Sequence, residues 1–327
     1  MGSADTDPGR FTVHHAEVRG KVELAFVREG VGGRPLLLVH GYPETKRIWW
    51  RVIEPLAEAG YEVIVPDLRG YGDSGLAADG FYDIAAYSLD LHALVHDVLG
   101  HDTTTVAGGD VGGVVLYDLG LRFPGFVTHQ VVFNTVTPLL DDVYAAAGLA
   151  PDDLRGRRAQ SDYTSSDPTH RPRGRRSATT DYFFRQATEP DALLAELDTP
   201  ERRRAWVAPM YGHRLWGTPD AFTAEEVAFH TEPFADAERL RASWAVYEHS
   251  AGRRAMEDTP RMFEQTPVPS LVLYGPEDHV VLPSFPQKMA AACLDCTGPL
   301  IVPASGHFVP WEAAVTFAKI TAAFCRG

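Results

Sequence analysis

An aspartate stands in the middle of a glycine-rich turn, where its carboxylate could act as a nucleophile. Residues 108–113 read Gly-Gly-Asp-Val-Gly-Gly, follow the predicted strand 103–108 and lead into an apolar helical run. Glycines allow a strained strand-to-helix turn that projects one side chain from the carboxyl edge of a sheet. Asp110 has no proton to give to a base, but it can displace a leaving group from saturated carbon and form a covalent ester. Taken alone, the pattern also fits a turn whose aspartate caps a helix.

Two further motifs precede this turn, each directly after a predicted strand. Residues 40–44 read His-Gly-Tyr-Pro-Glu, and residues 67–74 read Asp-Leu-Arg-Gly-Tyr-Gly-Asp-Ser. In order and placement, these motifs and the Asp110 turn resemble the α/β-hydrolase fold superfamily. They are most similar to its epoxide hydrolase family, in which an HGxP turn accompanies an aspartate nucleophile. By this resemblance, the backbone N–H groups of Tyr42 and Val111 form the oxyanion hole, where fixed dipoles need no reorganisation as charge develops.

The resemblance also locates the two groups that complete a catalytic triad. In this family the nucleophile, the acid and the histidine follow one another along the chain. Asp278 lies in a Gly-Pro-Glu-Asp-His segment where the family has its acid, with Glu277 as the nearby alternative. His307 lies in a Gly-His-Phe segment that resembles the one bearing the family's general base. In the implied reaction Asp110 forms the ester, and His307, held in one tautomer by Asp278, takes a proton from the water that hydrolyses it.

An epoxide oxygen needs an acid while its carbon is attacked, and in epoxide hydrolases two tyrosines of the cap domain usually supply it. A phenol can donate a hydrogen bond to the developing alkoxide and then its proton. The segments around Tyr182 and Tyr247 resemble those that carry the two tyrosines, so these residues are the expected acids. For any one tyrosine, a ring packed in the interior with its hydroxyl satisfied is the alternative. The candidates in this region are Tyr144, Tyr163, Tyr182, Tyr211 and Tyr247.

Aromatic residues near these groups are candidates for the walls of a substrate pocket. The four expected to bind substrate are Trp49, Trp50, Phe183 and Trp244. For the two adjacent tryptophans, a helix that packs against the sheet is an equally good interpretation. Gly109 stands where histidine is common in the family, and Val111 stands where an aromatic residue is frequent. These departures affect the shape of the pocket but remove no catalytic group.

The elements that must position these residues alternate between strands and helices. From residue 22 to 136, and again after residue 270, short β-branched runs alternate with helical stretches, which is typical of a largely parallel sheet with helices on its faces. Four apolar residues recur at helical spacing and predict an amphipathic crossover helix that Gly100 ends. They are Leu91, Leu94, Val95 and Val98. The predicted strands are Val22–Glu29, Pro35–His40, Tyr61–Asp67, Thr103–Gly108, Val127–Thr135, Ser270–Tyr274 and Pro299–Val302.

Residues 137–260 break this alternation, because they contain helix starts but no convincing strand. Pro200 directly after a threonine is typical of the first turn of a helix, and Thr223 with Glu226 three residues later matches a capping box. Within this region, residues 155–176 carry seven arginines and two aspartates. A charge run without periodicity is usually a solvated loop, and we interpret it so.

Together the pattern and the resemblance predict an α/β-hydrolase fold with a mostly parallel central sheet flanked by helices. Residues 1–136 and 261–327 are expected to form the core. Residues 137–260 are expected to form an all-helical cap inserted after the sixth strand.

The amino-acid composition limits the classes of partner that we expect for the protein. The chain has 327 residues, of which 45% are hydrophobic and 23% charged, the ordinary balance of a globular protein. With 30 Lys and Arg against 44 Asp and Glu the net charge is −14, which disfavours nucleic acid or an anionic membrane surface as a partner. We therefore expect a small-molecule substrate, a largely apolar epoxide, with no nucleic acid, no membrane, no cofactor and no metal. A homodimer is left open.

A cytoplasmic location is expected. The first ten residues are polar and lack the apolar core of a secretory signal, and no uncharged apolar run approaches the ~18–20 residues of a membrane span. Three cysteines, Cys293, Cys296 and Cys325, cannot form the even framework of a small secreted domain. The first two form a CxxC without a second ligand pair, so they are interpreted as structural thiols.

Other functions share parts of this pattern. A haloalkane dehalogenase uses the same aspartate, histidine and acid, but typically needs an indole N–H beside the nucleophile for the halide, which Val111 and Tyr42 cannot supply. A non-catalytic ligand-binding relative would keep the fold and the pocket, yet it has no need of three triad residue types in order. An enzyme that opens an epoxide with an internal hydroxyl would use the same site. A serine esterase is excluded, because the turn carries no serine.

Overall fold

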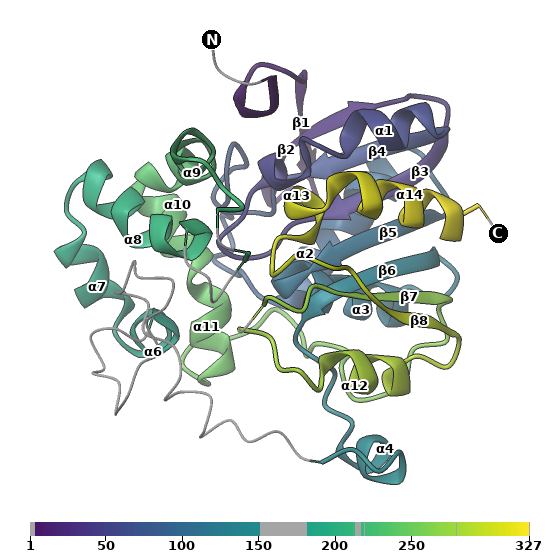
Figure 1. Cartoon of the computed structure of the whole chain (residues 1–327). Coiled ribbons are helices and arrows are strands. Elements are labelled where there is room, and N and C mark those ends of the chain that lie inside the picture. The colour runs from purple at the N-terminus through teal and green to yellow at the C-terminus, as the bar shows by residue number, and fades with distance from the viewer. Residues whose placement is uncertain (1–3, 151–181, 213–216, 219, 279, 327) are drawn as a thin grey trace.

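The computed structural model describes residues 4–150, 182–212, 217–218, 220–278 and 280–326. Its centre is an eight-stranded sheet with the order β1-β2-β4-β3-β5-β6-β7-β8 (Figure 1). β2 pairs antiparallel with β1 and with β4, and all the other neighbours are parallel. The strands are β1 (Val13–Val18), β2 (Val22–Glu29), β3 (Arg34–Val39), β4 (Tyr61–Pro66), β5 (Thr104–Gly109), β6 (Val127–Thr135), β7 (Ser270–Tyr274) and β8 (Cys296–Ile301).

The seven predicted strands are confirmed as β2 to β8, with small shifts at their ends. The central strands β4, β5 and β7 are buried along their whole length, as expected of a parallel sheet covered on both faces. β1 was not predicted, because its sequence, Val-His-His-Ala-Glu-Val, has few β-branched residues. It forms a largely exposed edge that is held by antiparallel pairing with β2.

Helices cover both faces of the sheet (Figure 1). α1 packs beside α14 on one face, and α2 packs beside α3 on the other. α3 also contacts β5 and β6, and α12 contacts β7 and β8. These helices and the short ones that accompany them are η1 (Ala4–Thr6), η2 (Lys46–Trp49), α1 (Ile53–Glu58), α2 (Ile84–His92), η3 (Ala93–Val98), α3 (Asp110–Arg122), α4 (Asp141–Ala146), α12 (Phe285–Ala292), α13 (Val309–Glu312) and α14 (Ala314–Phe324).

A second group of helices, here called the cap helices, lies beside the sheet, at left in Figure 1. The cap helices are α6 (Tyr182–Thr188), α7 (Pro190–Glu196), α8 (Pro200–Gly212), α9 (Ala224–Thr231), η4 (Glu232–Ala235), α10 (Ala237–Ser243) and α11 (Ala245–Ser250). α8 begins at Pro200, and Thr223 forms a capping box with Glu226 at the start of α9, so both predicted helix starts are confirmed. None of the described residues between 141 and 250 lies in a strand.

α4 comes directly after β6 but packs on the core. Its Tyr144 and the preceding Leu140 share an apolar cluster with Phe285 and Met289 of α12. The exact division into core and cap at residue 137 stays a prediction. The arginine-rich segment 155–176 and Tyr163 lie outside the described residues.

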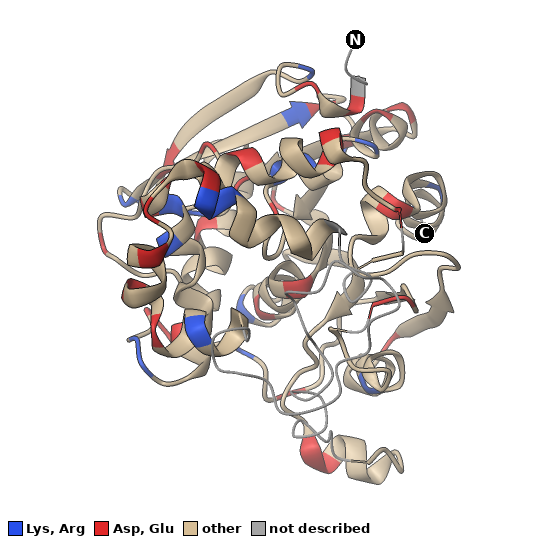
Figure 2. Cartoon of the chain, turned by 60° about the vertical axis from the view of Figure 1, so that its left-hand side comes forward, with Lys and Arg blue, Asp and Glu red and all other residues tan. Residues whose placement is uncertain are grey.

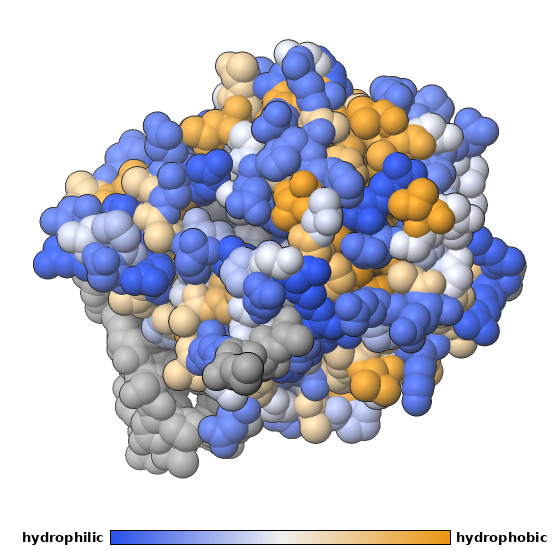
Figure 3. Space-filling view, turned by 90° about the horizontal axis from the view of Figure 1, so that it is seen from above, coloured by the Kyte–Doolittle hydropathy of each residue, from blue (hydrophilic) through white to orange (hydrophobic). Residues whose placement is uncertain are grey.

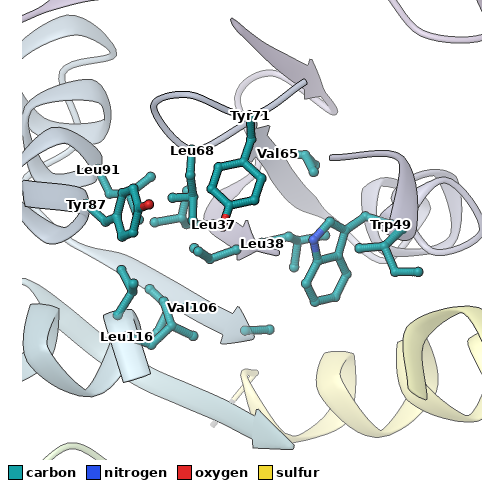
Figure 4. Close-up of a cluster of buried hydrophobic side chains, with 14 of the residues drawn as sticks. Leu37, Leu38, Trp49, Val65, Leu68, Tyr71, Tyr87, Leu91, Val106 and Leu116 are labelled. Atoms are coloured by element: carbon teal, nitrogen blue, oxygen red, sulfur yellow. The ribbon is translucent and has the colours of Figure 1, made fainter. Parts of the chain in front are cut away.

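The crossover helix changes its winding near its end. Tyr87 and Leu91 of α2 point into a buried cluster between the helices and the sheet (Figure 4). Gly100 follows the helix with φ 76°, as expected of a helix stop. Val98, which was predicted on the buried face, is 44% exposed. The physical reason is that the segment Ala93–Val98 is π-helical, so its wider turn rotates later residues away from the α-helical register.

Charged residues of both signs are interspersed on the cap helices and around the core (Figure 2). The face seen from above is mostly hydrophilic, with scattered apolar residues (Figure 3). In the described part of the chain, no helix combines the length and the apolar character that crossing a bilayer requires.

Candidate active site

The turn from β5 into α3 holds Asp110 in a strained conformation over the carboxyl edge of the sheet. The backbone of Asp110 lies in the left-handed region, with φ 45°. A Cβ added to Gly112 would lie 2.3 Å from the carbonyl oxygen of Val39, and one added to Gly113 would lie 2.6 Å from Cβ of Thr135. Glycine is therefore required sterically, because the start of α3 is pressed against the ends of β3 and β6.

The two carboxylate oxygens of Asp110 have different surroundings. Oδ1 accepts the backbone N–H of Tyr42 at 2.8 Å, and the N–H of Val111 also donates to the carboxyl group. Oδ2 lies 3.5 Å from Nε2 of His307. Burial raises the pKa of Asp110, while the charge of His307 and the two N–H groups oppose that rise. Oδ1 is thus held by fixed donors, and Oδ2 faces the imidazole.

His307 is paired with Asp278 in the interior. Nδ1 of His307 lies 2.8 Å from Oδ2 of Asp278, and both residues are 1% exposed. Oδ1 of Asp278 accepts the N–H groups of Val280 at 2.7 Å and Val281 at 3.0 Å. Burial alone would lower the pKa of His307, but the neighbouring carboxylates, Asp278 foremost, raise it to about 9. Glu277, the alternative acid, is exposed.

Two buried residues that were not predicted from the sequence support this arrangement. Asn134, at the end of β6, donates from Nδ2 to Oδ2 of Asp278 at 2.9 Å, and its Oδ1 accepts the N–H of Gly275 at 2.8 Å. Glu44 accepts the N–H of Gly41 at 2.6 Å, and burial raises its pKa to about 7. Glu44 closes the His-Gly-Tyr-Pro-Glu motif and could have been singled out there. For Asn134, the only feature of the sequence that could have singled it out is that a polar residue ends an otherwise apolar strand.

The two predicted tyrosines lie together, and both rings neighbour that of Tyr42, whose N–H binds Asp110. Tyr182 of α6 and Tyr247 of α11 are buried, with ring centroids 5.9 Å apart and edge to face. The ring of Tyr42 lies 6.5 Å from that of Tyr182 and 5.3 Å from that of Tyr247. Burial raises the pKa of Tyr247 well above its usual value, and the charge of Asp110 adds to the rise. The hydroxyl of Tyr247 therefore keeps its proton.

The other described tyrosines of this region use their hydroxyl groups elsewhere. Tyr144 donates to the carbonyl oxygen of Pro138 at 2.8 Å. Tyr211 donates to the carbonyl oxygen of Pro43. Both hydroxyls are bound to backbone, which is the structural role considered for any tyrosine in this region.

The four predicted pocket residues fall into two groups. The ring of Phe183 meets that of Tyr247 edge-on at 5.0 Å, and Trp244 is fully buried among the cap helices. Trp49 packs against aromatic rings of β6 and α14, and Trp50 packs against those of the N-terminal segment and α9. The contacts of Trp49 and Trp50 are those of core packing, the alternative interpretation, so neither is retained as a pocket wall.

The hydroxyl of Tyr42 links the turn that binds Asp110 to the cap helices. We assign the Gln186 side-chain oxygen as the acceptor of three donors: the Tyr42 hydroxyl at 2.5 Å and the indole N–H groups of Trp244 at 3.1 Å and Trp206 at 3.2 Å. Burial raises the pKa of Tyr42, so its hydroxyl stays a donor. The residue whose backbone binds Asp110 is thereby tied to α6, α8 and the start of α11.

We expect Tyr42→Phe to weaken this link without removing the backbone donor. The loss of one buried hydrogen bond should lower the free energy of unfolding by about 1 kcal/mol. A small displacement of the Tyr42 N–H should lower kcat by roughly tenfold. Chemical denaturation and steady-state kinetics measure both effects. The matched control is Tyr61→Phe, which removes a buried hydroxyl bound to the carbonyl of Ala322. An equal fall in kcat in both variants would contradict the special role of Tyr42.

Comparisons with known proteins agree with this fold. A family described as the alpha/beta hydrolase fold matches residues 34–314. The AB hydrolase superfamily protein YfhM of Bacillus subtilis is 30% identical in an alignment 230 residues long, which covers 61% of this chain and 78% of that protein. Epoxide hydrolase A of Mycobacterium tuberculosis is 41% identical over 102 residues, but this match spans only 31% of either chain.

A solved structure extends the similarity to nearly the whole chain. The epoxide hydrolase CorEH without ligand matches with a TM-score of 0.75 and 23% identity, over 96% of this chain and 98% of that one. At this identity the match establishes the fold. Since the family match covers most of the sheet, the Asp110 turn and the loop of His307, the chain belongs to the α/β-hydrolase fold family.

Proposed function

We propose that the protein is an epoxide hydrolase that opens an epoxide to a vicinal diol through a covalent ester on Asp110. One observation carries the proposal. The Asp110 carboxylate has one oxygen on backbone donors and the other 3.5 Å from a buried His307–Asp278 pair, below two buried tyrosines of the cap. This is the set of groups that nucleophilic opening of a neutral, strained ring requires.

The first step is attack by Oδ2 of Asp110 on a ring carbon. The C–O bond of that carbon breaks, and its electron pair moves to the ring oxygen. Tyr182 and Tyr247 donate hydrogen bonds to the developing alkoxide, and one of them supplies its proton. Protonated His307 favours the ionised nucleophile before attack, because its positive charge lowers the pKa of Asp110.

The second step is hydrolysis of the ester. His307 takes a proton from water, and the resulting hydroxide attacks the ester carbonyl carbon of Asp110. The carbonyl oxygen takes up negative charge on the N–H groups of Tyr42 and Val111, which already bind the carboxyl group in the free enzyme. Collapse of this intermediate breaks the bond between the carbonyl carbon and the ester oxygen, and protonated His307 gives its proton to the departing diol oxygen. The carboxyl group of Asp110 then loses its proton, and the phenolate left by the first step regains one. Ester formation removes the charge of Asp110, one of the groups that raise the pKa of His307. A larger fraction of His307 is thereby neutral, and so able to accept a proton from water, at the step that needs it.

The surroundings favour a largely apolar epoxide. Aromatic rings of Tyr42, Phe183 and Tyr247 pack together near the nucleophile. The curated epoxide hydrolases that match this chain support the same substrate class, although the matches span less than half of each protein. No cofactor is needed for either step, because the carboxylate, the imidazole and the phenols supply the nucleophile, the base and the acid.

A haloalkane dehalogenase is less well supported. Such an enzyme needs indole N–H groups aimed at the leaving halide beside the nucleophile. Here the indole N–H groups of Trp206 and Trp244 point to the oxygen of Gln186. A non-catalytic binding protein is also less well supported, because binding alone has no evident use for two carboxylates and an imidazole in this arrangement.

The proposal extends to the organisation of the chain. We take residues 1–136 and 261–327 as the core and residues 137–260 as the inserted cap region, whose cap helices carry Tyr182 and Tyr247 while α4 packs on the core. The three cysteines are free thiols, which supports a reducing, cytoplasmic compartment.

The activity can be tested with three substrate classes on the full chain. We expect diol formation from styrene oxide or 1,2-epoxyhexane, measured by chromatography. Halide release from 1-chlorohexane and hydrolysis of a p-nitrophenyl ester are expected to be at background. Turnover of the chloroalkane or the ester without diol formation would overturn the proposal.

Replacing Tyr182 or Tyr247 with phenylalanine tests whether these residues act as the acid that donates to the epoxide oxygen. We expect Tyr247→Phe and Tyr182→Phe each to lower kcat by roughly 10²-fold, because the developing alkoxide loses a donor. Tyr144→Phe is the matched control, since its hydroxyl donates to the carbonyl oxygen of Pro138 and its ring packs in the cluster with α12. The measurement is steady-state diol formation. Equal rates in Tyr247→Phe and Tyr144→Phe would remove Tyr247 from the mechanism.

The pH dependence of the two steps should differ. His307 must be neutral to act as a base, and its pKa is raised to about 9 in the free enzyme and falls when Asp110 is esterified. We expect the rate of ester hydrolysis to rise with pH and to level off below pH 9, because the pKa of His307 in the ester lies below its free-enzyme value of about 9. Ester formation should change little between about pH 6 and pH 9. Single-turnover quench experiments separate the two rates, and a hydrolysis rate that falls as pH rises would contradict the assignment of His307.

A further inference from the structure

A π-helical turn lies at the end of the crossover helix, away from the active site. The segment Ala93–Val98 follows α2 directly, and the N–H of Leu99 donates to the carbonyl of Leu94 at 3.0 Å, an i→i+5 bond. In an α-helix of 3.6 residues per turn, positions i and i+4 share a face but i+5 does not. The wider π turn brings i+5 back toward that face, and such turns are frequent at functional sites.

Three residues with metal-binding side chains occupy these positions. His92, His96 and Asp97 stand at i, i+4 and i+5, and each offers one ligand atom within 4.8 Å of the others. The two imidazole rings are stacked with centroids 5.0 Å apart and planes 20° apart. Oδ1 of Asp97 lies 2.7 Å from Nδ1 of His96. Imidazole nitrogens and a carboxylate oxygen are typical ligands of Zn²⁺ and similar divalent ions.

The position of His92 is fixed before any ion binds. Its ring stacks on that of Phe123 at 3.7 Å, with planes 16° apart, and also contacts Phe126 at 4.6 Å. An imidazole that is already held in place loses little side-chain entropy when it becomes a ligand.

We propose that His92, His96 and Asp97 form a surface site for a divalent transition-metal ion such as Zn²⁺. Three protein ligands leave coordination positions for water or for a group from another molecule, so the site is open. It is separate from the ester chemistry, because Asp110 and Phe123 stand at opposite ends of α3. Thirteen residues at 1.5 Å each place them about 20 Å apart. A bound ion would cross-link the end of α2 to the π-helical segment that follows it.

The test is titration of the metal-free full chain with ZnCl₂ by calorimetry, with CoCl₂ absorbance as a second readout. We expect one ion per chain with a micromolar dissociation constant and a higher melting temperature in Zn²⁺. His92→Ala and His96→Ala should each weaken binding at least tenfold, and Asp97→Asn should weaken it less. Circular dichroism checks that each variant is folded, and diol formation should be unchanged.

Two controls separate this site from other ligands on the chain. His14→Ala removes an exposed imidazole on β1, and Cys296→Ser removes the more accessible thiol of the CxxC pair. Both variants should bind Zn²⁺ as the parent does. Binding that survives His96→Ala, or that is lost in Cys296→Ser, would overturn the proposal, as would the absence of binding at millimolar Zn²⁺. The test measures metal binding and not epoxide turnover. A failure of this proposal would therefore leave the proposed function untouched, and a failure of the proposed function would leave this proposal untouched.

Discussion

Replacing Asp110 with alanine is expected to abolish diol formation, with a fall in kcat of roughly 10⁴-fold or more. The reason is that the proposed reaction passes through an ester on this carboxylate, and no other described carboxylate is held by the N–H groups of Tyr42 and Val111. Glu44 is buried nearby, but its carboxyl group binds the N–H of Gly41. Product formation under steady-state and single-turnover conditions measures the loss.

The control for this variant is Glu277→Ala, which removes an exposed carboxylate next to Asp278. It should retain diol formation within a few-fold of the parent. Circular dichroism and thermal melting check that Asp110→Ala is folded, because alanine tolerates the left-handed backbone at this position no better than aspartate does. Turnover near the parent rate in Asp110→Ala would mean that water attacks the epoxide directly.

His307→Gln should allow the ester on Asp110 to form but should block its hydrolysis. Ester formation needs the carboxylate of Asp110 and a phenol, but ester hydrolysis needs the imidazole to take a proton from water. We therefore expect a burst of one epoxide consumed per enzyme, followed by turnover lowered by roughly 10³-fold. Intact-protein mass spectrometry should show a mass increase equal to the epoxide, and peptide mapping should locate it on Asp110.

His14→Gln is the matched control, because it changes an exposed histidine on β1. That variant should turn over normally and carry no added mass. A parent-like rate in His307→Gln would remove the histidine from the mechanism. An inactive His307→Gln that never gains mass would instead mean that the histidine is needed before ester formation.

The strand pattern predicted seven of the eight strands, and with the family resemblance it predicted that the Asp110, Asp278 and His307 loops meet. The carboxyl ends of parallel strands share one edge, so motifs that follow such strands converge there even when they are far apart in the chain. In the structure, His307 lies within hydrogen-bonding distance of Asp278 and 3.5 Å from Asp110. The cap tyrosines could be named only by resemblance, since helical periodicity does not say which face meets the core.

Other features depend on contacts that no local pattern encodes. Asn134 contacts Asp278 across 144 positions in sequence, and the hydroxyl of Tyr42 meets Gln186 across 144 as well. Both contacts depend on where β6 and α6 lie in the folded chain, and this tertiary arrangement cannot be read from a local sequence pattern. The π-helical turn was not predicted, for a different reason. Its apolar spacing also fits an α-helix, and only the exposure of Val98 shows that the register has changed.

The central claim, an ester on Asp110, is tested most directly by one turnover in ¹⁸O-labelled water with enzyme in excess over the epoxide. In the proposed mechanism water attacks the ester carbonyl carbon, so its oxygen stays on the enzyme. The new oxygen of the first diol comes from the Asp110 carboxylate. We predict ¹⁸O in the peptide that contains Asp110 and almost none in the first-turnover diol. ¹⁸O in that diol, with an unlabelled Asp110 peptide, would contradict the account.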